Sequence, residues 1–377
     1  MYFNLFNLLI FFGVFQGIIL GVVLLSLRKK GDMNTIFLSC LIFSLSLSIG
    51  KHLIIDLYKE NEWGHALILP VSCFLLMGPF LYFYVKTTLG KKIIPGKNLF
   101  LHLLPGLIFL IIQIVIFINT WISNSVVHQS IISFFQLCEQ GLGLISLVVY
   151  GILSLKKVIR YQKAITDYYS NIEYITLQWL INLLIALFLG WLLILFMTLI
   201  DLIIYGFTLP QSAYYFVFIY IGIIIHYFGL RKLTMTHFPI LRPLEQINTT
   251  VNDNTEEIEE ERDDAKVEIE KLEEIMVTEK PYLDPNLTLD SLSEMVGIHS
   301  KKLSTILNQK MNTSFYDFIN TARVEEVKRK INDSNHSHLT ILGIALESGF
   351  NSKSSFNAIF KKYTGMTPRE FKNQKPS

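Results

Sequence analysis

Residues 340–363 read TILGIALESGFNSKSSFNAIFKKY, and this stretch predicts two short helices separated by a tight turn. Gly349 supplies the left-handed residue at which the first helix breaks. Ser352 is a suitable N-cap for the second helix. Helical spacing indicates an inward face made of Ile341, Ile344, Ala345, Phe356 and Phe360. The outer side of the second helix then carries Lys353, Ser354, Asn357 and Lys361.

The same pattern occurs earlier, where residues 287–311 read LTLDSLSEMVGIHSKKLSTILNQKM. Thr288 is a suitable N-cap, Gly297 ends the first helix, and we expect Ser300 to cap the second. The inward positions are Leu289, Leu292, Val296, Leu303 and Leu307. The outward positions are Lys301, Lys302, Ser304, Thr305 and Asn308. A helix, a turn with glycine and a second helix make a helix-turn-helix, and the outward side chains suit phosphates and base edges.

A strongly amphipathic segment, FYDFINTARVEEVKRKI at 315–331, joins the two units. Its apolar side chains would seat both units on one core; they are Phe315, Phe318, Ile319, Ala322 and Val327. The chain closes with TPREF, in which Thr367 is a cap, Pro368 takes the first helical position and Glu370 the third. This is a capping box with proline at its preferred place.

Residues 280–374 resemble the DNA-binding domain of the AraC-type transcription regulators. The matching motifs are LSEMVGIHSKKLS in the first unit, then IALESGF, Phe356 and IFKKYTGMTPREF. The resemblance implies two recognition helices, joined by one long helix, that enter successive major grooves on one face of the duplex. The chain departs from the family's pattern after Arg323, where Val324, Glu325 and Glu326 follow instead of the frequent alanine.

By this resemblance the first recognition helix would contact DNA through Ser300, Lys301, Lys302, Thr305 and Asn308. The second would do so through Asn351, Lys353, Ser354, Asn357 and Lys361. The structural positions of the motif would be Gly297, Gly349, Phe350, Phe356, Phe360, Gly365 and Pro368.

The N-terminal part of the chain is built from long apolar runs. About 20 apolar residues cross the hydrocarbon core of a bilayer as a helix. Seven runs qualify: Phe3–Leu27, Asn34–Ile55, Ala66–Val85, Leu99–Ile122, Ile131–Leu155, Leu177–Tyr205 and Ala213–Leu230. Small residues at spacing four, namely Gly13, Gly17 and Gly21, would allow close helix packing in the first. The sixth run is long enough to tilt or bend.

The loops give the orientation, because positive charge stays on the cytoplasmic side. The loops after runs one, three and five contain Arg28, Lys29, Lys30, Lys86, Lys91, Lys92, Lys97, Lys156, Lys157, Arg160 and Lys163. Arg231 and Lys232 follow run seven, whereas the alternate loops contain only Lys51 and Lys59. We therefore expect the N-terminus outside and the C-terminus in the cytoplasm, in the inner (cytoplasmic) membrane of a cell.

Charge separates three regions. Residues 1–242 hold 16 Lys and Arg against 8 Asp and Glu, residues 243–279 hold 3 against 14, and residues 280–377 hold 14 against 9. The acidic stretch predicts a flexible tether that becomes helical. Ile258, Ala265, Ile269, Leu272 and Met276 lie near heptad spacing. This helix either forms a short coiled coil in a homodimer, or packs Leu272 and Met276 on the next domain.

Chemistry-bearing clusters are sparse. Asp201, Glu139, His226 and His52 lie toward the ends of apolar runs, and a ligand or ion role stays open mainly for Asp201 and Glu139. The cysteines lack metal-ligand spacing, and His336 and His338 alone do not make a metal site. We predict no enzyme activity, no cofactor and no metal.

The expected fold is all-α: a seven-span transmembrane domain (1–232), an acidic and partly helical cytoplasmic linker (233–279), and two helix-turn-helix units joined by a long helix (280–377). The expected function is a membrane-bound regulator of transcription. Its partners would be double-stranded DNA, the lipid bilayer and an unidentified signal ligand. The alternative is a membrane receptor or transporter whose C-terminal domain binds a protein partner.

Overall fold

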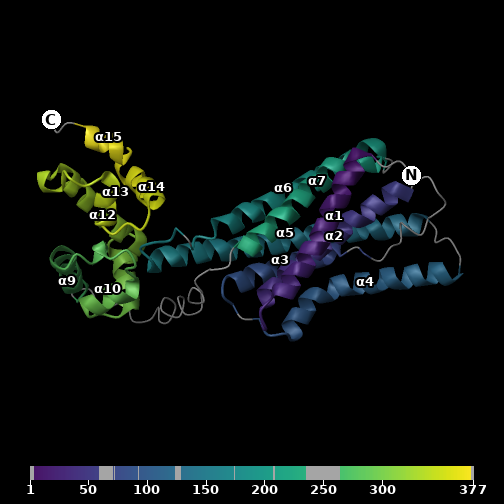
Figure 1. The fold of residues 1–377 in the computed structure, drawn as a ribbon. Coiled ribbons are helices and arrows are strands. Elements are labelled where there is room, and N and C mark those ends of the chain that lie inside the picture. The colour runs from purple at the N-terminus through teal and green to yellow at the C-terminus, as the bar shows by residue number, and fades with distance from the viewer. Residues whose placement is uncertain are drawn as a thin grey trace. The chain divides into compact units, whose positions relative to one another are not determined.

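A computed structural model describes residues 4–58, 71, 73–91, 93–123, 129–173, 175–206, 209–234 and 264–374. These residues are helical and contain no strand, as expected. The chain forms two compact units. Unit 1 comprises Met1–Ile159 with Leu177–Ile240, and unit 2 comprises Arg160–Thr176 with Leu241–Ser377. Figure 1 shows the helices of both units. Unit 2 is thus made of two separate stretches of sequence.

Unit 1 holds the apolar helices. They are α1 (Leu5–Leu27), α2 (Met33–Tyr58), α3 (Phe74–Thr88), α4 (Lys97–Ser123), α5 (Gln129–Tyr168, which continues into unit 2), α6 (Gln178–Ile200) and α7 (Tyr215–Thr234). Six helices in the described part of the chain are long and apolar enough to cross a membrane. The exception is α3, with 15 residues. Most of the first part of that predicted span, 66–70 and 72, lies outside the described residues, so the seventh span stays a prediction.

The outer surfaces of these helices remain apolar. In α4 only 11% of the most apolar stretch of 18 residues is buried within the structure. Large exposed side chains include Ile111, Ile122 and Ile203. Soluble proteins rarely leave apolar patches of this extent in contact with water, so the surface suits lipid.

The glycines of α1 permit the close packing expected of them. At Gly13 an added Cβ would lie 3.5 Å from the Cα of Gly222 in α7. At Gly17 it would lie 2.1 Å from Ser46 Oγ in α2. A larger residue at Gly17 would therefore push the helices apart.

Asp201, Glu139 and His52 each contact a neighbouring side chain or backbone group in unit 1. The sixth run ends in a π-helical turn, Asp201–Tyr205, rather than in regular helix. The Asp201 carboxylate accepts hydrogen bonds from the Leu209 amide at 2.9 Å and from the Tyr214 hydroxyl at 3.1 Å. These two hydrogen bonds therefore join the C-terminal end of α6 to the short 3₁₀ turn Gln211–Tyr214. Glu139 accepts a bond from Gln113 at 3.1 Å, and His52 stacks on Phe218.

Unit 2 contains both helix-turn-helix units. Its helices are α9 (Asp264–Thr278), α10 (Leu289–Val296), α11 (Ser300–Thr305), α12 (Phe315–Asn332), α13 (Ile341–Leu346), α14 (Lys353–Thr364) and α15 (Pro368–Asn373). Shorter turns are Pro281–Leu283, Ile306–Lys310 and Ser334–His336. The caps at Thr288, Ser352 and Thr367 form as predicted. Gly297, Gly349 and Gly365 all have positive φ.

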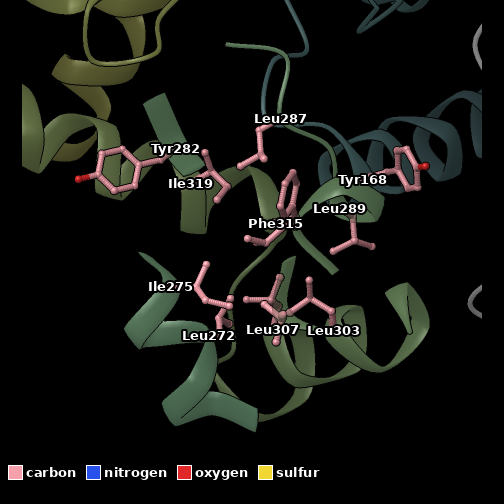
Figure 2. Close-up of a cluster of buried hydrophobic side chains, with 12 residues drawn as sticks. Tyr168, Leu272, Ile275, Tyr282, Leu287, Leu289, Leu303, Leu307, Phe315 and Ile319 are labelled. Carbon is pink, nitrogen blue, oxygen red and sulfur yellow. The ribbon is translucent and has the colours of Figure 1, made fainter. Parts of the chain in front are cut away.

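Two buried clusters hold this unit together, and α12 contributes to both. The first core contains Leu272, Leu292, Leu303, Leu307, Phe315 and Ile319, with Phe315 near its centre (Figure 2). The second core contains Val324, Val327, Ile344, Ala345, Phe350, Phe356, Ile359 and Phe360. The long helix α12 thus contributes side chains to both units, and it does so in two cores instead of the single core expected.

The helix α9 packs on its own chain. Leu272 and Ile275 are buried in the first core and Met276 packs against it. This is the second of the two readings of the heptad-like pattern; Ile258 lies outside the described residues. The compact unit therefore begins before residue 280.

We predict that Gly349→Ala destabilises unit 2 more than Gly365→Ala does. Both glycines have a left-handed φ, which costs other residues about 1 kcal/mol. At Gly349 an added Cβ would also meet the Tyr282 carbonyl oxygen at 2.2 Å, whereas nothing lies within 4 Å at Gly365. The additional cost should be roughly 1–3 kcal/mol. Urea titration of the full chain in detergent, with pulse proteolysis of unit 2, measures the free energy of unfolding of both variants. Equal losses would contradict the close approach.

Candidate nucleic-acid interface

The second recognition helix is α14. Ser352 caps it by accepting a bond from the Ser355 amide at 3.1 Å. Phe356, Ile359 and Phe360 bury one side in the second core. The opposite side exposes the predicted contact residues Lys353, Ser354, Asn357 and Lys361, and Asn351 is exposed just before the helix. Their exposure fits a role at a nucleic acid, and the contacts themselves stay a prediction.

The first recognition helix is shorter than expected. Regular helix covers Ser300–Thr305 and continues as a π-helical turn over Ile306–Lys310. Thr305 and Asn308 are exposed; Ser300, Lys301 and Lys302 are half-buried. Lys302 forms an ion pair with Glu268 of α9 at 2.6 Å.

Two expectations for this helix were wrong. Ser300 does not cap it: the N-cap is His299, without a side-chain hydrogen bond, and Ser300 is the first helical residue. Ser304 does not face outward: its side chain is buried and receives a bond from Asn308 Nδ2 at 3.3 Å. Ser304 lies in the regular part of the helix, next to the buried Leu303 and two residues before the buried Ile306, so it falls at the edge of the inward face.

The orientation of α12 depends on Arg323, whose side chain is 1% exposed. Its Nε donates to the Tyr282 carbonyl at 2.8 Å, and one terminal nitrogen donates to the Asp284 carbonyl at 2.7 Å. The guanidinium also reaches the Ser170 carbonyl at 3.3 Å and the Ser170 hydroxyl at 3.2 Å. Burial lowers the pKa of Arg323 to about 10, so the group remains a cation at neutral pH.

The partner of Arg323, Ser170, belongs to a segment that sequence reasoning missed. Residues 160–176 follow the apolar part of α5, and the backbone at Tyr169 pairs with Thr288 in an isolated bridge. Ser170 Oγ donates to the Leu287 carbonyl at 2.7 Å. Tyr168 joins the first core, and its hydroxyl donates to Asp290. The signal that could have found this contact is the tyrosine-rich run YYSNIEY at 168–174, which is unusual for a solvated loop.

A second polar cluster fixes α14 on α12. The Asp317 carboxylate receives bonds from Lys362 at 2.8 Å, Tyr363 at 2.5 Å and Ser314 at 2.9 Å. Partial burial alone would raise the pKa of Asp317, but these bonds hold it below its ordinary value. The recognition helix therefore has a defined orientation relative to the connecting helix.

Acidic side chains from residues 160–176 contact both recognition helices. Glu173 accepts a bond from Ser352 Oγ at 2.5 Å and a second from Ser354 Oγ. Asp167 lies beside Asn308. No group of three His, Cys, Asp or Glu side chains suited to a metal ion occurs in the part of the chain that the structure describes, and His336 pairs with Asp333 at 3.0 Å.

Comparisons with known proteins agree with this geometry. Residues 292–374 match a family model described as a helix-turn-helix domain. The chain is 34% identical over 96 residues to an uncharacterized HTH-type transcriptional regulator of Staphylococcus aureus (strain COL), covering 26% of this chain and 12% of that protein. It is 32% identical over 89 residues to the melibiose operon regulatory protein of Escherichia coli (strain K12), covering 24% of this chain and 28% of that protein.

The match to the family model lies in the C-terminal part of the chain, and the chain spans about an eighth of the length of the Staphylococcus relatives. No solved structure matches. The matched region is an AraC-type helix-turn-helix domain, and the relatives are transcription regulators by name, not enzymes.

We predict that Arg323→Met destabilises unit 2 by roughly 3 kcal/mol or more, because several buried oxygens lose their donor at once. Arg369→Met, at an exposed site on α15, serves as the matched control and should change stability by about 0.5 kcal/mol or less. Chemical denaturation of the full chain in detergent compares the two. Similar stabilities of both variants would show that Arg323 does not organise the unit.

Proposed function

We propose that the protein is a membrane-bound, sequence-specific DNA-binding regulator of transcription that couples a signal at the membrane to gene expression. The observation that carries this proposal is the presence of two helix-turn-helix units and six membrane-length apolar helices in one chain. The helix-turn-helix units bind the duplex. The apolar helices hold the protein in the bilayer and sense the signal.

The exposed side chains of α14 support DNA as the partner. Lysine supplies phosphate contacts, whereas asparagine reads adenine through paired hydrogen bonds. Two recognition helices held by one connecting helix suit half-sites about one helical turn apart, roughly 34 Å. Phosphate contacts would make the affinity fall steeply with salt.

The loop charges support the orientation. The basic cluster Arg28, Lys29 and Lys30 is exposed directly after α1, and Arg231 and Lys232 lie at the end of α7. With these ends in the cytoplasm, unit 2 reaches the chromosome from the inner membrane.

We predict that Lys353→Glu and Asn357→Ala weaken duplex binding by the full chain in nanodiscs. Each removes a contact expected to contribute roughly 1–3 kcal/mol, which corresponds to about 5- to 150-fold in Kd. Lys372→Glu makes the same charge change at an exposed position on α15 and is the control. Fluorescence anisotropy over a salt series measures the affinities.

If the two variants and the control bind equally, the contact assignment is wrong. Absence of any salt-dependent, sequence-preferring duplex binding would instead favour a protein partner for unit 2.

A reporter fused after Ser377 tests the topology. A fluorescent protein that folds only in the cytoplasm should be bright, and alkaline phosphatase at the same position should be inactive. The reverse result would place unit 2 away from the chromosome and exclude the proposed function.

A further inference from the structure

Residues 160–176, which comprise the end of α5 and the connection to α6, are anchored on the DNA-binding part of unit 2. Arg323 holds the backbone carbonyl and the hydroxyl of Ser170. Asn320 Nδ2 donates to the same carbonyl at 3.0 Å. Tyr168 contributes to the first core. These contacts fix the direction in which the chain leaves Ser170 toward Glu173.

Glu173 lies at the N-terminus of α14. Its two carboxylate oxygens accept bonds from Ser352, the N-cap, and from Ser354, a predicted DNA contact. A helix N-terminus attracts anions, since its first amide groups lack intrahelical partners and the helix dipole is positive there. DNA phosphates bind at the same kind of position. Glu173 therefore has the place and the sign of charge that a phosphate would have.

The first recognition helix is covered in the same way. Asp167 lies beside Asn308, and Glu268 holds Lys302 at 2.6 Å. Three carboxylates thus engage predicted contact residues on both recognition helices. Two of them belong to residues 160–176: Asp167 in the last turn of α5, and Glu173 in the connection that follows. A duplex approaching this face would meet negative charge where its own phosphates must lie.

We propose that residues 160–176 form an autoinhibitory latch, in which Glu173 and Asp167 occupy the DNA-contacting face of unit 2 and compete with the phosphates of the duplex. This inference rests on the proposed function. Only molecules with an open latch bind DNA. The apparent Kd of the whole population is therefore the intrinsic Kd divided by the open fraction.

The latch also provides a route for the signal. Its N-terminal end is the last part of α5, which is continuous from Gln129 to Tyr168, and its C-terminal end is followed at once by α6. A change in either helix acts on the segment through the covalent chain, without passing through residues 235–263. Such a change shifts the equilibrium between closed and open latch.

The test uses the full chain in lipid nanodiscs and a fluorescent duplex enriched from a random-sequence pool. Glu173→Ala should tighten binding on the order of tenfold, because a charge-assisted contact to the closed state is lost. Adding Asp167→Asn should tighten it further. Glu274→Gln removes a carboxylate at an exposed position on α9 and should leave the Kd unchanged. Adding Lys353→Glu to Glu173→Ala should remove the gain.

The outcomes separate the latch from the proposed function. If wild type, Glu173→Ala and Glu274→Gln bind equally while Lys353→Glu weakens each, DNA binding stands and the latch is overturned. If none of the proteins binds any duplex, the proposed function fails and the latch fails with it.

Hydrogen exchange gives a second readout that does not depend on a change of affinity. Saturation of the wild-type chain with the duplex should speed exchange at residues 171–173, since Glu173 must leave the N-terminus of α14 while Ser170 stays on Arg323. Unchanged or slower exchange there, with DNA bound, would overturn the proposal.

Discussion

The buried guanidinium of Arg323 is the constraint on which the rest of unit 2 depends. A buried cation needs acceptors for its donors, and Arg323 finds them on three parts of the chain: the Tyr282 and Asp284 carbonyls, Ser170, and Asn320 on its own helix. The same guanidinium leaves no room for a side chain at position 349, because a Cβ at Gly349 would lie 2.9 Å from Arg323 Nε. The turn before α10, the turn before α14 and the segment after α5 are thereby brought to one side chain.

Local chemistry explains which features were predictable. The caps at Thr288, Ser352 and Thr367 and the left-handed glycines depend on residues within one turn, so the sequence states them directly. The cores follow from helical periodicity. The contact of Ser170 with Arg323 joins residues 153 positions apart, and no periodic pattern marks such a pair. The buried position of Ser304 was missed because Ser304 lies beside Leu303 at the boundary of the apolar face, where a small polar side chain can face either way.

In the apolar N-terminal part, composition predicted the helices but not the structural role of their polar residues. Asp201 and Glu139 looked like candidates for a ligand because charge is costly in lipid. The structure gives each a hydrogen-bond donor from a neighbouring element: Leu209 and Tyr214 for Asp201, and Gln113 for Glu139. A polar side chain near the end of an apolar run can therefore serve helix packing, and sequence alone does not separate that role from binding.

The discontinuity of unit 2 has a consequence for how such a protein can arise. A helix-turn-helix module that folds from one stretch of chain can be joined to any sensor by gene fusion. Here the module takes Tyr168 from the end of α5 and Ser170 from the connection that follows it, both encoded far upstream. Recombination at the boundary near residue 264 would separate Arg323 from the carbonyl and hydroxyl of Ser170. The membrane half and the regulatory half of this gene are therefore expected to be inherited together and to change in concert.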